Sequence, residues 1–156
     1  HIKADAYGKL WVTSRGDYEG ISSKLFVLDK KFGRNEMQVT DTLNISCSDF
    51  CISGDSLYYY ATEWNNKTQQ NTISYGIINV KTKQKLSDLF ITDGTERDIT
   101  IPYGIAVHPE THDIYVTDAK NYVSSGVLHC YNRYGVHKWS VRTGDIPAHM
   151  CFLVRK

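Results

Sequence analysis

Apolar residues along this chain fall into short runs of roughly four to seven residues that are rich in Val, Ile, Tyr and Phe. Gly, Asn, Asp and Ser separate these runs. Short apolar runs of this composition, bounded by turn-forming residues, are typical of β-strands. The pattern therefore predicts an all-β chain with no helix.

The same strand–turn–strand pattern occurs three times. It covers residues 7–13 with 25–29, residues 55–60 with 76–79, and residues 113–117 with 128–132. The repeat length is about fifty residues, which is typical of β-propeller blades, and a closed propeller needs roughly four to eight blades. We therefore predict about three four-stranded antiparallel blades in an incomplete ring.

Turn-forming residues set the expected boundaries of the blades. We expect a first blade over residues 1–43, a second over 44–95 and a third over 96–145. The start of the chain, 1–6, is expected to be the inner strand of a blade already under way. Residues 146–156 are expected to supply one lone inner strand of a further blade, from Ala148 to Val154, with its outer strands upstream of this sequence. This follows because Ile146-Pro147 repeats Ile101-Pro102.

Middle strands of a propeller are covered on both faces, so their apolar residues should lie between neighbouring blades. The expected core residues are Leu10, Val12, Leu57, Tyr59, Ile114 and Val116. The four cysteines have neither the spacing of a redox pair nor that of a zinc ribbon. We expect buried thiols at Cys47, Cys51, Cys130 and Cys151, with a Cys130–Cys151 bridge as the alternative.

Charge and motifs argue against several functions. A formal net charge of +1 gives no basis for binding nucleic acid or an anionic membrane, and no apolar run is long enough for a membrane span. Motifs for zinc proteases, serine hydrolases and phosphate-binding loops are missing from the sequence, and its six histidines are scattered. We therefore expect no catalysis, no cofactor and no metal site.

The third unit also resembles a known family. The run from Ile101 to Pro109, Ile114-Tyr115-Val116-Thr117-Asp118-Ala119, and the later segment Gly144-Asp145-Ile146-Pro147 resemble YncE-like, surface-layer-type propellers of Gram-negative gut bacteria. The resemblance covers nearly the whole chain and is strongest over residues 101–153. It implies a seven-bladed lipoprotein, of which this is the C-terminal half, exported to the outer-membrane surface or the periplasm. Some relatives of this kind capture corrinoids such as vitamin B12 beside a TonB-dependent transporter.

Topology predicts where a ligand would bind. In a four-stranded blade, the loop between the second and third strands and the loop entering the first strand emerge at the same end. Aromatic rings beside hydrogen-bonding groups suit a sugar or a corrin, and near-zero net charge favours a neutral or zwitterionic ligand. The predicted ligand-binding residues are Arg15, Asp17, Tyr18, Trp64, Asn65, Tyr103, Asp118, Asn121, Tyr122 and His149.

Some of these residues also have a structural interpretation. The rings of Trp64 and Tyr122 would cap the blade ends, and Asp17 and Asp118 would cap their own turns. The function that we predict is capture of a corrinoid-like or glycan-like small molecule at the cell surface for outer-membrane uptake. The expected partners are the remaining blades or a second copy of the chain, and a TonB-dependent transporter, but no nucleic acid. The alternatives are a protein-interaction scaffold and a metal-dependent lactonase-type enzyme.

Overall fold

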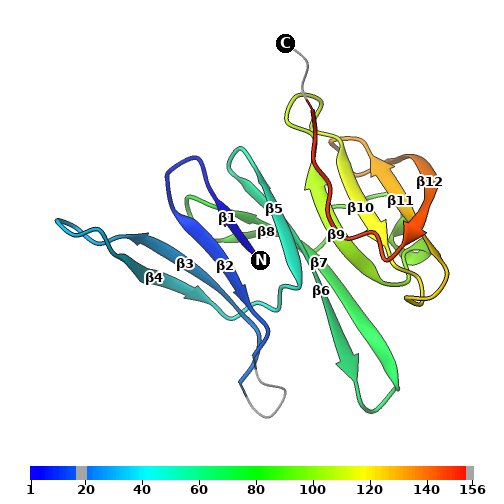
Figure 1. Ribbon diagram of the computed structural model, residues 1–156, viewed down its shortest axis with the longest axis horizontal. Helices are drawn as coiled ribbons and strands as arrows, with labels where there is room; N and C mark the ends of the chain where they lie inside the picture. The colour runs from blue at the N-terminus through cyan, green and yellow to red at the C-terminus, as the bar shows by residue number, and fades with distance from the viewer. Residues whose placement is uncertain (17–20, 154–156) are drawn as a thin grey trace.

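The computed structural model of the protein describes residues 1–16 and 21–153. These residues form three four-stranded antiparallel sheets, and the strands of each sheet pair in chain order (Figure 1). The first sheet contains β1 (Ile2–Ala4), β2 (Leu10–Ser14), β3 (Lys24–Lys30) and β4 (Met37–Leu43). The second contains β5 (Asp49–Ser53), β6 (Ser56–Asn65), β7 (Gln70–Asn79) and β8 (Lys85–Ser87). The third contains β9 (Pro102–Val107), β10 (Ile114–Asp118), β11 (Ser125–Tyr131) and β12 (His137–Asp145).

The all-β prediction and the threefold repeat are confirmed. The three sheets are consistent with propeller blades, although the described residues do not close a ring (Figure 1). Strand β1 confirms the inner strand expected at the start of the chain. One short element differs from the prediction, because a 3₁₀-helix, η1 (Thr95–Asp98), lies in the connection between the second and third sheets. Within the described residues, no helix is long and apolar enough to cross a membrane.

The first strand of each sheet lies toward the middle of the molecule, where β5 contacts both β1 and β9 (Figure 1). In the second and third sheets, an asparagine at the end of the third strand or directly after it forms the turn to the fourth strand. The Asn79 side-chain oxygen accepts hydrogen bonds from the backbone N–H groups of Lys81 and Thr82. Asn132 does the same for Tyr134 and Val136. Asparagine favours such turns because its side chain replaces a backbone acceptor.

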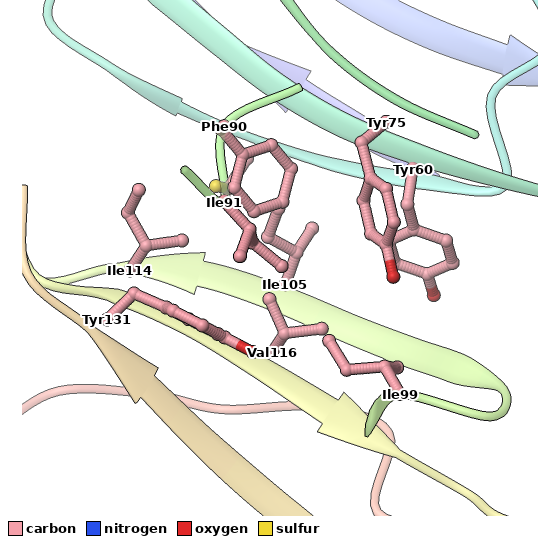
Figure 2. Packing of buried hydrophobic residues seen from close by; sticks show 10 residues of the cluster. Tyr60, Tyr75, Phe90, Ile91, Ile99, Ile105, Ile114, Val116 and Tyr131 are labelled. Atoms are coloured by element: carbon pink, nitrogen blue, oxygen red, sulfur yellow. The ribbon is translucent and has the colours of Figure 1, made fainter. Parts of the chain in front are cut away.

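Two apolar clusters hold the sheets together. The cluster between the second and third sheets is built from both facing surfaces and from the connection after β8 (Figure 2). It contains Cys51, Tyr60, Tyr75, Phe90, Ile91, Ile99, Ile105, Ile114, Val116 and Tyr131. The cluster between the first and second sheets contains Trp11, Leu25, Val27, Cys47, Phe50, Leu57, Tyr59, Ile78 and Val80. Burial of Leu57, Tyr59, Ile114 and Val116 is therefore confirmed.

The prediction is wrong for Leu10 and Val12, which are only half-buried. Residues alternate between the two faces of a strand, so Trp11 points toward the second sheet and its two neighbours point away from it. No sheet formed by the described residues covers that outer face. A middle strand is covered on both sides only where a sheet packs on each side, and the first sheet has a described neighbour on one side alone.

The end of the described chain also differs from the prediction. Residues 146–153 form no strand, whereas a lone strand was expected from Ala148 to Val154. This segment crosses the third sheet instead, with its backbone close to Gly104 and the Phe152 ring 5.3 Å from that of Tyr115 (Figure 1). A strand requires hydrogen bonds to a neighbouring strand. The described residues place no such neighbour beside the segment.

The cysteines are free thiols, so the Cys130–Cys151 bridge is not formed. Cys47, Cys51 and Cys130 are buried as predicted, and burial raises the pKa of each of these thiols. Cys151 is exposed, contrary to the prediction. It lies in the segment over the third sheet, and the described residues place no further layer on this segment.

Candidate functional site

A cleft of about 1250 Å³ opens between the three sheets at the end of the molecule predicted for binding. Its walls come from Arg15 and residues 21–24, the β6–β7 hairpin, Tyr122 after β10, and the segments that lead into the inner strands. Five of the predicted residues line it: Arg15, Trp64, Tyr103, Tyr122 and His149. The topology that places these connections at one end explains why side chains so distant in sequence meet there.

Trp64 supplies the most exposed aromatic ring of the cleft, at 56% of its surface. It lies on β6, where it is paired with Asn71 of β7, and not on a loop as the sequence indicated. Asn65 ends the same strand, and its side-chain oxygen accepts hydrogen bonds from the N–H groups of Lys67 and Thr68. The hairpin therefore continues through polar residues to a turn at 66–69, and this holds Trp64 in a fixed register.

Two tyrosines form the wall contributed by the third sheet. The rings of Tyr103, on β9, and Tyr122, after β10, meet edge to face with centroids 5.6 Å apart. They remain 36% and 46% exposed. Tyr122 has a φ of 63°, a left-handed conformation that is uncommon for a side chain of this size. Five other described non-glycine residues share a positive φ, so this conformation belongs to the turn after β10 and does not by itself assign a role to the ring.

Histidines and a carboxylate lie where the inner strands begin. His1 Nδ1 is 3.1 Å from the Asp49 carboxylate, and the rings of His1 and His149 lie 5.9 Å apart. Burial raises the pKa of Asp49 above its ordinary value, against the opposing effect of its hydrogen bond from the Phe50 N–H group. Both histidines line the cleft.

Sequence reasoning missed several residues of the cleft. Lys24, Ser46, Ser48 and Glu63 line it, and the Ser46 hydroxyl donates a hydrogen bond to the Glu63 carboxylate. The available signal for Glu63 was its place beside Trp64 in the segment that the sequence indicated as a loop at the binding end. No comparable signal marked Lys24 or the two serines, because their position depends on how the first and second sheets face each other.

Three predicted residues lie away from the cleft lining. Asn65 and Asn121 accept hydrogen bonds within their own turns. Asp118 is fully buried and forms an ion pair with Lys120 at 2.8 Å. Its carboxylate accepts hydrogen bonds from the N–H groups of Thr100 and Ile101 at 3.0 and 2.8 Å. A further hydrogen bond, from the Lys120 backbone N–H group at 2.8 Å, matches the turn-capping interpretation of Asp118. The predicted residues Asp17 and Tyr18 lie outside the described residues.

The lining of the cleft is mainly aromatic and polar. Across the described residues, no group of three or more His, Cys, Asp or Glu side chains is placed to hold a metal ion. What converges instead is exposed aromatic surface, hydroxyl groups, two amides and a few charged groups. The sequence matches no protein-family model, and no curated protein shows significant similarity to it.

Proposed function

We propose that the three sheets are consecutive blades of a β-propeller and that the cleft is a non-catalytic binding site for a ring-containing small molecule. The observation that carries this proposal is the convergence of exposed rings from two sheets on one cleft. Trp64 comes from the second sheet, and the Tyr103–Tyr122 pair comes from the third. Exposed aromatic rings bordered by polar groups are typical of sites that bind flat or polar-rimmed rings.

The size of the cleft supports a ligand of glycan or corrinoid dimensions. Pockets for drug-sized ligands occupy roughly 300–1,000 Å³, and this cleft reaches about 1250 Å³. Its open form and polar lining favour an extended or polar-rimmed ligand over a compact apolar one. The remaining blades, or a second copy of the chain, would complete the ring and enlarge the site.

The biological setting that we propose rests on the resemblance over residues 101–153. The protein is exported to the outer-membrane surface or the periplasm, and it captures its ligand for uptake by a TonB-dependent transporter. A protein-interaction scaffold would use the same end of the molecule to bind a polypeptide. A lactonase-type enzyme would instead require a bound divalent cation, for which the described donor set offers no support.

Removal of the aromatic rings tests the binding site. The probes are cyanocobalamin and a panel of neutral and acidic oligosaccharides, titrated by calorimetry. The Trp64→Ala, Tyr122→Ala double variant should bind its ligand at least about tenfold more weakly and keep its melting temperature, because buried aromatic anchors contribute about 2 kcal/mol or more each.

Tyr134→Ala is the matched control. Tyr134 is 70% exposed in the β11–β12 turn, at the opposite end of the third sheet from Tyr122. Its removal should leave affinity unchanged. Equal binding by the double variant and the parent, or loss of binding in the Tyr134 variant alone, would contradict the proposal.

A further inference from the structure

The first-sheet wall of the cleft carries two cations that have no partner among the described residues. Arg15 follows β2, Lys24 begins β3, and both line the cleft. Across residues 1–16 and 21–153, neither the guanidinium of Arg15 nor the ammonium of Lys24 takes part in a hydrogen bond or an ion pair. Six lysines elsewhere are paired with aspartates: Lys9, Lys81, Lys83, Lys85, Lys120 and Lys138.

The carboxylates in and near the cleft are already engaged. Glu63, the one carboxylate among the described lining residues, accepts a hydrogen bond from Ser46. Asp49, just below the lining, pairs with His1. Among the described lining residues, the two positive charges of Arg15 and Lys24 outnumber the one negative charge of Glu63, although the chain as a whole carries only +1. Net charge over a whole chain does not report the local charge that a ligand meets.

The two cations and the exposed aromatic rings line the same cleft. Burial and the neighbouring Tyr103 raise the pKa of Tyr122, and the positive charge of Arg15 opposes them. A side chain of the first sheet thus influences a ring of the third sheet across the cleft. A ligand between these walls meets a guanidinium and an ammonium on one side and exposed rings on the others.

We propose that the cleft selects an acidic sugar, in which a pyranose ring packs on Trp64 or on the Tyr103–Tyr122 pair while its carboxylate binds Arg15 and Lys24. The inference rests on the proposed function and adds the chemical class of its ligand. An arginine can bind a carboxylate through two parallel hydrogen bonds, and a lysine adds a point charge. A sugar that lacks the carboxylate keeps the stacking contact but loses this charged contact.

The test compares one sugar with and without its charge. Trigalacturonate and its trimethyl ester have the same rings, and only the acid carries carboxylates. Calorimetric titration of the full chain should give at least about tenfold tighter binding of the acid, because hydrogen bonds to charged groups are the stronger ones. Affinity for the acid should fall between about 50 mM and about 500 mM NaCl, whereas affinity for the ester should not.

Substitution of Arg15 and Lys24 tests whether these two cations cause the preference for the acid. The Arg15→Gln, Lys24→Gln double variant should lose the preference for the acid and bind the ester as the parent does. Lys30→Gln is the matched control, because Lys30 ends the strand that Lys24 begins and lies at the opposite end of it. That variant should bind both sugars like the parent.

The outcomes separate this inference from the proposed function. Equal affinity for acid and ester, binding of cyanocobalamin or neutral sugars alone, or an equal loss in the Lys30 variant would overturn the acidic-sugar proposal and leave the binding site standing. If no probe binds, or if every bound probe is indifferent to Trp64→Ala, Tyr122→Ala, both proposals fail.

Discussion

At the scale of single residues, the cleft and the fold use similar side chains for different purposes. Trp64 and the Tyr103–Tyr122 pair, which the sequence predicted as ligand-binding residues, are exposed and line the cleft. Asp118, predicted for the same site, is fully buried below it. An aspartate after a strand either faces a ligand or caps its turn, and the sequence offers no sign of which. Burial and hydrogen-bond partners distinguish the two.

The first prediction concerns the pH dependence that Asp118 creates. Its burial acts to raise the pKa, but the hydrogen bonds from Lys120 and from the N–H groups of Thr100 and Ile101 outweigh burial and lower it. The folded chain therefore holds this proton less tightly than the unfolded chain, where the pKa is about 3.9. The stabilisation is present above that value and is lost as pH falls through the lower, folded pKa.

Asp118→Asn should cost about 2 to 4 kcal/mol at pH 7, because it weakens three charge-assisted hydrogen bonds and leaves Lys120 without its partner. It should also flatten the loss of stability below about pH 4. Urea denaturation over a pH series measures both effects. The control is Asp88→Asn, whose carboxylate is 89% exposed beside Lys85 and should matter little. If the Asp118 variant lost stability below about pH 4 as steeply as the parent does, this account would be contradicted.

At the scale of elements, apolar runs identified the strands, and the errors fall where strands are polar. Strands β6 and β7 extend through Glu63-Trp64-Asn65 and 70–74, which the sequence indicated as loop. The pairing of these two strands continues past the ends of their neighbours β5 and β8, so the hairpin extends through mostly polar residues. The positions facing each neighbour were correct for the second and third sheets. They were wrong for the first sheet because periodicity reveals alternation, not whether a second layer is present.

The second prediction uses two equivalent positions to test this account. Val116 of β10 is fully buried against the second sheet, whereas Val12 of β2 occupies the matching position in the first sheet and is half-buried. Val116→Asp should cost about 4 kcal/mol or more through a buried unpaired charge, and Val12→Asp about 1 kcal/mol.

Thermal unfolding of both variants measures the difference. For a domain of this size, each kcal/mol moves the melting temperature by roughly 2 to 4 °C, so Val116→Asp should melt about 8 °C or more below the parent. Similar melting temperatures for the two variants would show that the two faces of the first sheet are assigned incorrectly.

At the scale of the whole molecule, the sequence predicted the repeat better than the site. The repeat is visible because each sheet is encoded by a local run of about fifty residues. The cleft is built from all three sheets, so Lys24 and Ser48 became visible only once the sheets were placed. The local charge of the cleft was also not predictable from the sequence, because a nearly neutral chain carries a positive cleft wall.

The arrangement also leaves an apolar surface on the first sheet. Strand pairing places Val12 opposite Ile2 and Phe26, and Leu10 opposite Ala4 and Leu28. The other face of this sheet is apolar as well, with Trp11, Leu25 and Val27 buried against the second sheet. Sheets that are apolar on both faces are typically covered on both. The outer face of the first sheet therefore has the composition of an interface.

The last prediction follows from that surface. A hydrophobic dye such as 8-anilinonaphthalene-1-sulfonate should bind the native chain, and the Val12→Lys, Phe26→Lys double variant should lose about half or more of its fluorescence. Its melting temperature should stay within about 3 °C of the parent, since both side chains are already partly in water. The control is Phe32→Lys, whose ring is fully exposed in the β3–β4 turn and stands outside the patch. Because a single exposed ring offers too little contiguous surface, that change should leave the dye signal as it was. A dye signal that survives in the double variant, or falls equally in the Phe32 variant, would show that the first sheet does not present this apolar face to solvent.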